Sequence, residues 1–148
     1  MLGQVGDDAD GHSYVEFLSN EGIQTENIQK LRDVPTGQAF IFSLADGNNS
    51  IIINGGANMT YAPNDDTGHA FPDSWRETIA QSSLLLLQRE VPRFVNIEAA
   101  KVAKANNVAV IFDLGGRDDP VTNETISLCD IISPNETELS RMLATLPK

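Results

Sequence analysis

The sequence has few basic residues, histidines, cysteines and aromatic residues, and these shortages argue against several classes of function. Only 10 Lys and Arg stand against 21 Asp and Glu, which gives a formal net charge of −11. Nucleic acids and anionic membranes bind through basic surfaces, so we expect no nucleic acid and no membrane as a main partner. Two histidines and one cysteine cannot supply the four nitrogen or sulfur ligands of a structural zinc site.

Long apolar runs and several well-known catalytic motifs are also absent. No run reaches the roughly 18 apolar residues of a membrane-spanning helix, and no signal-peptide pattern opens the chain. The lack of a Gly-Lys pair, of G-x-G-x-x-G and of G-x-S-x-G argues against a P-loop, a Rossmann dinucleotide site and a hydrolase elbow. The single Cys129 is typical of a buried side chain in a reducing compartment, so the expected location is cytoplasmic.

The apolar residues that are present, 41% of the chain, predict an α/β fold. Runs without polar alternation indicate parallel strands buried on both faces, joined by right-handed helical crossovers. The predicted strands span 2–5, 84–87, 108–112 and 129–132, and the predicted helices span 14–22, 74–80, 94–106 and 134–146. Two β-rich runs around an Asp-Gly turn predict an antiparallel hairpin over 36–54, and 120–128 is expected to be a looser segment.

Polar residues follow three of these strands, at the sheet edge where parallel sheets gather their ligands. Glu90 is either a solvated loop carboxylate or an acceptor for the hydroxyl of a polyol. Asp113 equally suits a structural role, because aspartate readily hydrogen-bonds the backbone two residues on and would brace the Gly115-Gly116 turn.

The segment 133–138, Ser-Pro-Asn-Glu-Thr-Glu, allows two interpretations. Ser133 with Glu136, or Asn135 with Glu138, has the spacing of a capping box, and proline suits the first helical turn. Alternatively, the strand-to-helix turn presents free N–H groups to a phosphate while a carboxylate orients hydrated Mg²⁺.

Six segments in this order resemble the ribokinase (PfkB-type carbohydrate kinase) family over nearly the whole chain: 3–11, 35–39, 49–53, 56–58, 86–92 and 130–138. The resemblance implies a three-layer α/β/α fold with a small β-lid, to which the 36–54 hairpin would contribute. By position, Glu90 is similar to the glutamate that contacts the sugar hydroxyls, and Ala39 and Ile51 would line the sugar pocket. Asn135 and Glu138 match the N-x-x-E motif that organises Mg²⁺ and the nucleotide phosphates.

The chain also departs from this family pattern. Ribokinases commonly carry Asn-Pro-Ala-Pro where this chain has Asp-Leu-Gly-Gly at 113–116; the acidic form resembles another branch and makes Asp113 a second candidate metal ligand beside Glu138. The family's Gly-Gly-Lys-Gly-Ala-Asn and Gly-Ala-Gly-Asp segments are not found. We therefore expect residues 1–148 to form a partial kinase domain that lacks the catalytic base and is inactive alone.

The complete enzyme implied by the resemblance transfers the γ-phosphoryl group of ATP to a primary hydroxyl of a pentose, with ribose as the expected acceptor and Mg²⁺ as the cofactor. The family's lid also implies a homodimer through the hairpin. Two alternatives stay open from the sequence: a non-catalytic module that binds a partner chain through the hairpin and sheet edges, and a kinase of the same family that acts on fructose or a nucleoside.

Overall fold

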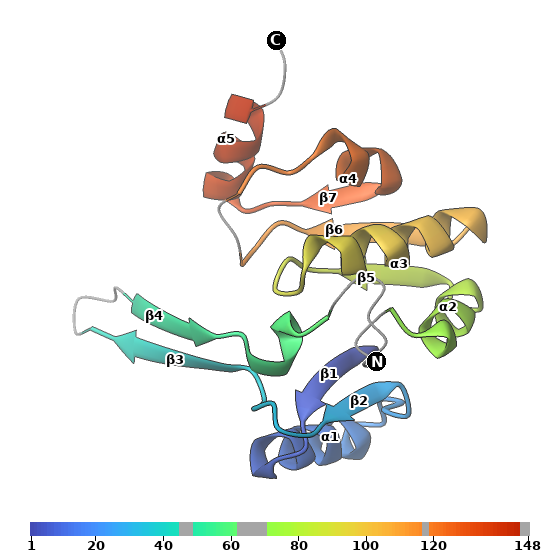
Figure 1. The fold of residues 1–148 in the computed structure, drawn as a ribbon. Helices are drawn as coiled ribbons and strands as arrows, with labels where there is room; N and C mark the ends of the chain where they lie inside the picture. The colour runs from blue at the N-terminus through green and yellow to red at the C-terminus, as the bar shows by residue number, and fades with distance from the viewer. Residues whose placement is uncertain (45–48, 62–70, 117–118, 146–148) are drawn as a thin grey trace. The chain divides into compact units, whose positions relative to one another are not determined.

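A computed structural model describes residues 1–44, 49–61, 71–116 and 119–145 of the chain (Figure 1). The chain divides into two units, Met1–Thr60 and Tyr61–Lys148. The described strands form a parallel pair, an antiparallel hairpin and a parallel three-stranded sheet. The predicted α/β class with parallel sheets and an antiparallel hairpin is confirmed, although the described strands form separate sheets where the sequence predicted one.

The first unit begins with a strand–helix–strand motif. Strand β1 (Gly3–Gly6) pairs in parallel with β2 (Ile28–Leu31), and helix α1 (Ala9–Asn20) connects them. The helix ends as predicted, because Gly22 adopts a left-handed φ of 78° and its N–H donates to the Ser19 carbonyl. The sequence prediction missed β2, whose four residues IQKL carry only a weak apolar signal.

The predicted hairpin consists of β3 (Gln38–Ser43) and β4 (Asn49–Asn54), followed by the short 3-10 helix η1 (Gly56–Met59). The Asp46-Gly47 turn predicted for it lies outside the described residues. The antiparallel register pairs Ile41 with Ile51 and Phe40 with Ile52. Side chains alternate between the two faces of a hairpin, so both faces are apolar, and all of these side chains are exposed: Phe40, Ile41, Phe42, Ile51, Ile52 and Ile53.

The second unit contains the three-stranded parallel sheet in the order β5-β6-β7. Its elements are α2 (Asp73–Ala80), β5 (Leu84–Leu87), α3 (Arg93–Ala105), β6 (Ala109–Asp113), α4 (Asn123–Leu128), β7 (Ile131–Ser133) and α5 (Glu136–Thr145). These elements match the predicted ones to within a few residues, apart from α4. The segment expected to be looser forms this helix because the Thr122 side chain accepts a hydrogen bond from the Thr125 N–H and caps its start.

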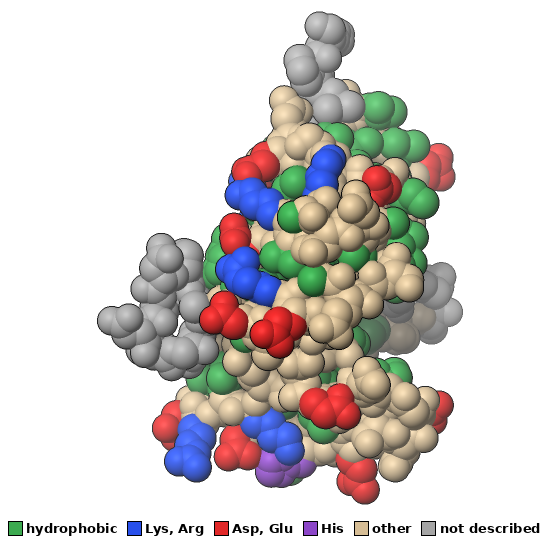
Figure 2. Space-filling view, turned by 90° about the vertical axis from the view of Figure 1, so that its right-hand side faces the viewer, with side chains coloured by type: hydrophobic (Ala, Val, Ile, Leu, Met, Phe, Trp, Pro, Cys, Tyr) green, Lys and Arg blue, Asp and Glu red, His purple; other side chains and the backbone are tan. Residues whose placement is uncertain are grey.

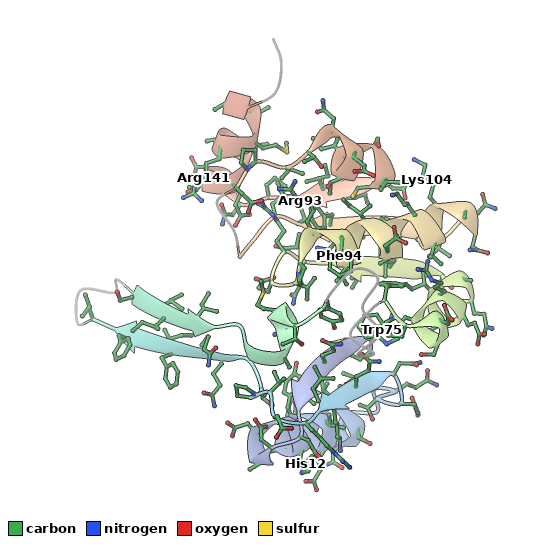
Figure 3. All side chains as sticks on the ribbon, viewed as in Figure 1. His12, Trp75, Arg93, Phe94, Lys104 and Arg141 are labelled. Carbon is green, nitrogen blue, oxygen red and sulfur yellow. The ribbon has the colours of Figure 1, made fainter. Side chains whose placement is uncertain are left out.

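One face of this sheet carries the core of the second unit. Leu85, Val110 and Phe112 are buried on it, and α3 packs against β5 and β6 with Val95 and Ala99 buried. Next to α3, the helix α2 buries an aromatic cluster around Trp75 (Figure 3), whose ring meets Tyr61 and Phe71 edge to face at centroid distances of 5.7 and 5.6 Å. The cluster anchors α2 to the segment before it.

The opposite face of the sheet differs from the prediction. The register places Leu86, Ile111 and Ile131 side by side, and Leu86 is 69% exposed and Ile131 55% exposed. The expectation that these strands are buried on both faces is therefore wrong for the chain as described. The apolar run reflects residues suited to a covered face, and the described residues cover only one of the two.

The described surface carries charges of both signs. On the face drawn in Figure 2, the Lys and Arg side chains lie among Asp and Glu side chains. Among the described residues, no helix combines the length and the apolar character needed to cross a membrane. Cys129 is half-buried and its thiol donates a hydrogen bond to the Thr125 carbonyl at 3.1 Å; burial raises the pKa of this thiol, which fits a packing role.

Candidate functional site

The carboxyl ends of β5, β6 and β7 lie at one edge of the sheet, as expected for parallel strands. The register pairs Leu87 with Phe112 and Asp113 with Ser133. Beyond the strands, the Leu114 N–H donates to the Ser133 carbonyl at 3.3 Å and holds the loop after β6 next to the end of β7. The residues predicted to follow the strands, Glu90, Asp113, Asn135 and Glu138, therefore all belong to this edge of the second unit.

The first glycine of the Gly115-Gly116 turn lies close to two of these carboxylates. Asp113 Oδ1 accepts a hydrogen bond of 2.7 Å from the Gly115 N–H, which is the bracing role that the sequence allowed. A β-carbon placed on Gly115 would lie 2.9 Å from Asp113 Oδ1 and 3.8 Å from Glu138 Oε1. The structure thus brings Asp113 and Glu138, the two predicted metal ligands, to the same side of the turn.

Glu90 lies against the second glycine of the turn. Gly116 has a left-handed φ of 85°, and a β-carbon on it would lie within 2.4 Å of Glu90 Oε1. Glu90 Oε2 is buried and has no hydrogen-bond partner among the described residues. A buried carboxylate oxygen without a donor is costly, although Glu90 as a whole is half-buried.

Asn135 and Glu138 form a complete capping box at the start of α5. The Asn135 side chain accepts from the Glu138 N–H at 2.9 Å, while the Glu138 carboxylate accepts from the Asn135 N–H and from Asn135 Nδ2, each at 2.8 Å. Of the two pairings that the sequence allows, the structure forms this one. The capping prediction is therefore confirmed. The same hydrogen bonds fix the direction of the Glu138 carboxylate beside the free N–H groups of the first helical turn.

Asp113 and Glu138 present carboxylate oxygens, the type of ligand that Mg²⁺ prefers. The described residues contain no group of three or more His, Cys, Asp or Glu side chains able to hold a metal ion. Mg²⁺ nevertheless binds through one or two carboxylates together with waters and substrate phosphates. Each oxygen of Glu138 accepts one hydrogen bond in the box and retains a lone pair, so the donor set of Glu138 and Asp113 fits this mode.

The two predicted sugar-pocket residues of the first unit share one face of the hairpin. Ala39 pairs with Ile53 across the hairpin and Ile51 pairs with Ile41, which places all four side chains on the same face. All four are exposed. Ala39 and Ile51 thus share one face, which is apolar at these four positions and ends at the polar pair Ser43 and Asn49.

Sequence reasoning missed a polar network in the first unit. Asp8, the N-cap of α1, accepts hydrogen bonds from the Thr36 hydroxyl at 2.6 Å, from the Thr36 N–H at 2.8 Å and from the Gly11 N–H at 2.8 Å. These three donors, in that order of effect, lower the pKa of Asp8 from 3.8 to about 2. The sequence analysis did not single out Asp8, whose partner Thr36 is 28 residues away and has no local signal.

The comparisons with known proteins agree with this arrangement. A sequence model described as pfkB family carbohydrate kinase matches residues 1–146, so the chain belongs to this family. The chain is 41% identical to a ribokinase from Arabidopsis thaliana over 144 residues, which cover 96% of this chain and 37% of the relative. It is 36% identical to a ribokinase from Staphylococcus aureus over 138 residues, which cover 93% of this chain and 43% of the relative.

A solved structure of Arabidopsis thaliana ribokinase, complexed with ribose and ATP, superposes with a TM-score of 0.86 at 41% identity. The match covers 97% of this chain and 45% of that one. The chain thus spans less than half the length of the relatives it matches.

Proposed function

We propose that the protein acts as a sugar kinase that transfers the γ-phosphoryl group of ATP to a primary hydroxyl of ribose. The observation that carries this proposal is the buried, unpaired Glu90 Oε2 beside Gly116, in a turn whose other glycine, Gly115, lies near Asp113 and Glu138. In this proposal Glu90 accepts a hydrogen bond from a bound ligand, and Asp113 and Glu138 bind a metal ion beside the phosphate groups. Membership of the family and the similarity to ribokinases support the proposal.

Each of the predicted residues has a distinct role in this proposal. Glu90 accepts a hydrogen bond from a sugar hydroxyl and orients the acceptor. Ala39 and Ile51 on the hairpin exclude water from the sugar. Asn135 directs the Glu138 carboxylate through the capping box, and α5 presents its first N–H groups to the nucleotide phosphates.

Magnesium and ATP complete the proposed reaction. Glu138 and Asp113 would hold Mg²⁺, which when bound neutralises the charge on the transferring phosphoryl group. Residues 1–148 contain no Gly-Ala-Gly-Asp segment, which in this family supplies the base that takes the hydroxyl proton. We therefore propose that residues 1–148 alone do not phosphorylate ribose, and ATP turnover dependent on D-ribose by the rigorously purified polypeptide would overturn this point.

The test of the proposed function uses the complete product of the gene. Replacing Glu90 with glutamine keeps the size of the side chain but weakens the hydrogen bond to the sugar, so we expect kcat/KM for ribose to fall by about tenfold or more. The matched control is Glu98→Gln on α3, whose carboxylate pairs with Arg76 and Lys101. Equal kcat/KM of the Glu90 and Glu98 variants would refute the role of Glu90. A higher kcat/KM of the wild type for fructose or a nucleoside than for ribose would show that ribose is not the acceptor.

Glu138→Gln separates capping from metal binding. Glutamine also completes a capping box, so the variant should unfold at nearly the same denaturant concentration as the wild type. The lost charge should nevertheless raise the Mg²⁺ concentration that half-saturates ATP turnover. Unchanged Mg²⁺ dependence would show that the box has only a structural role.

The hairpin favours a homodimer as the assembled form. One face, with Ala39 and Ile51, is assigned to the sugar, and the other exposes Phe40, Phe42 and Ile52. Two-stranded hairpins are marginally stable unless other surfaces cover them, so we assign the second face to a second copy of the chain. Sedimentation should show a dimer, and the Phe42→Ser variant should sediment as a monomer. We also propose a cytoplasmic location for the protein.

A further inference from the structure

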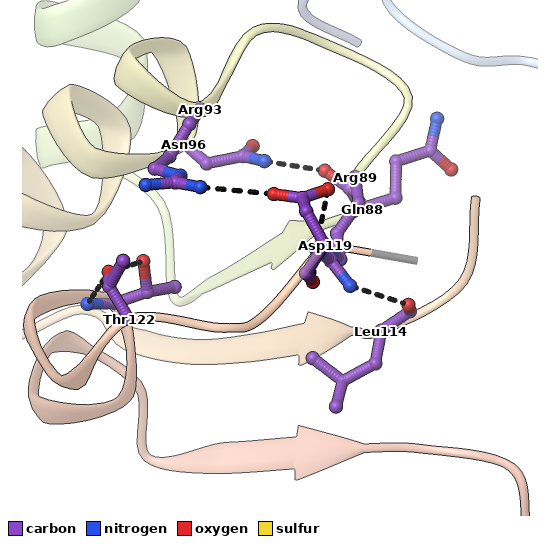
Figure 4. Close-up of polar contacts among 8 residues, drawn as sticks. Gln88, Arg89, Arg93, Asn96, Leu114, Asp119 and Thr122 are labelled. Atoms are coloured by element: carbon purple, nitrogen blue, oxygen red, sulfur yellow. Dashed lines mark hydrogen bonds and ion pairs between the residues drawn. The ribbon is translucent and has the colours of Figure 1, made fainter. Parts of the chain in front are cut away.

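Arg89, the residue directly before Glu90, is a buried cation at the end of β5. Its side chain is only 10% exposed, and its guanidinium donates to the Leu114 carbonyl at 3.4 Å and to the Asp119 carbonyl (Figure 4). The same group forms an ion pair of 3.1 Å with Asp119 Oδ1. Arg89 has no part in the chemistry proposed for Glu90, Asp113 and Glu138.

The contacts of Arg89 join the two ends of one loop. Leu114 precedes the Gly115-Gly116 turn and Asp119 follows it, so one guanidinium links both sides of the turn. The planar fork of arginine suits this task, because it reaches several acceptors in fixed directions where lysine offers a single charged centre. Arg89 therefore limits how far the turn can move relative to the end of β5.

The segment that carries Arg89 is itself held from the other side. Asn96 on α3 is buried and donates a hydrogen bond from Nδ2 to the Gln88 carbonyl at 2.6 Å (Figure 4). Residues 88–90 are thus fixed to α3 through Gln88 and to the loop after β6 through Arg89. The side chain of Glu90, in this fixed segment, lies against Gly116, the second glycine of the turn.

We propose that Arg89, together with Asp119, is a positioning residue that holds the Gly115-Gly116 turn against Glu90 and so sets the direction of the Glu90 carboxylate. The proposal rests on the proposed sugar-binding role of Glu90 for its effect on the reaction, but not for the contact itself. Burying an arginine costs desolvation energy that a well-packed apolar side chain would avoid.

The first experiment measures the contact without any activity. The complete gene product is labelled with ¹⁵N-glycine, and the amide resonance of Gly116 is compared between the wild type and Glu90→Gln. We expect Glu90→Gln to shift this resonance relative to the wild type. We expect a much smaller shift when the Arg89→Met variant is compared with the Arg89→Met, Glu90→Gln double variant. A shift of equal size in both backgrounds would overturn the proposal.

Two further variants keep this result interpretable. Arg93 also pairs with Asp119, at 3.0 Å, but is 52% exposed, so Arg93→Met should leave the Glu90-dependent shift intact. If Arg89→Met does not fold, Arg89→Lys takes its place, because lysine keeps the charge but lacks the planar fork whose two nitrogens reach Leu114 and Asp119 separately. A shift that disappears equally in the Arg93 variant would also count against the proposal.

The second experiment links the contact to the reaction. Arg89→Met should raise the KM for ribose by about 10- to 100-fold, the range expected when a binding group is misplaced, but should raise it little when Glu90→Gln is already present. An equal increase in both backgrounds would indicate general destabilisation and refute the positioning role. If Glu90→Gln leaves the KM for ribose unchanged while the Gly116 resonance behaves as expected, the sugar-binding proposal fails and the positioning contact stands.

Discussion

The most informative single substitution is Gly116→Ala, because the structure gives it two separate costs. Gly116 has a φ of 85°, and alanine in the left-handed region costs about 1–2 kcal/mol. Its β-carbon would also lie 2.4 Å from Glu90 Oε1, and moving that side chain off its preferred rotamer costs about 0.5–1.5 kcal/mol. We therefore expect a loss of about 1.5–3.5 kcal/mol in the free energy of unfolding.

Gly115→Ala is the matched control for this substitution. Its β-carbon would meet Asp113 Oδ1 at 2.9 Å, but its backbone lies outside the left-handed region. Both variants lose the same freedom in the unfolded chain, so Gly116→Ala should be the less stable by about 1–2 kcal/mol. Urea unfolding followed by the fluorescence of Trp75, the sole tryptophan, reports on the unit that contains both glycines.

A double-mutant cycle tests whether Glu90 carries the second cost. In the Glu90→Ala background the side chain that the new β-carbon would meet is gone, so Gly116→Ala should lose about 0.5–1.5 kcal/mol less. Two results would refute the reasoning: equal stability of Gly115→Ala and Gly116→Ala, or a cost of Gly116→Ala that does not depend on Glu90.

Three more predictions test other parts of the chain. Because the pKa of Asp8 is lowered to about 2, its contribution to stability is complete above pH 3.8 and is lost as the pH falls through about 2. In unfolding followed by circular dichroism, Thr36→Val should reduce the loss of stability between these two pH values. Asn135→Ala removes the cap of α5 and should cost about 0.5–2 kcal/mol, measurable by urea unfolding. Ile79→Ala should cost about 2–5 kcal/mol because Ile79 is 1% exposed, whereas Leu86→Ala should stay within about 0.5 kcal/mol; a large loss at Leu86 would show that its face is covered in solution.

The sequence predicted the elements whose signals are local. The apolar runs of β5 and β6 and the i, i+4 pattern of α3 mark these elements without reference to the rest of the chain. Gly22 and the Asn135–Glu138 spacing marked two helix ends for the same reason. The four-residue β2 has no such pattern, and α4 depends on a cap by Thr122 that a Pro-containing segment obscured.

The candidate site was predicted residue by residue, but its contacts were not. The sequence placed Glu90, Asp113 and Glu138 at strand ends, where parallel strands bring their last residues together. It could not show that Glu90 lies against Gly116 while Asp113 and Glu138 lie near Gly115, because that depends on loop geometry. Arg89 escaped notice because a charged residue after a strand is ordinarily exposed, and only packing shows that it is buried.

The apolar hairpin also has a consequence for the order in which the chain folds. Its strands are joined by a short connection between Ser43 and Asn49, and such hairpins close within about 1–10 μs. The parallel pair β5–β6 must first fold the crossover through α3, and pairing over longer sequence separation is slower. The hairpin therefore forms early, while both of its apolar faces are still exposed. Aggregation during refolding should then increase with chain concentration.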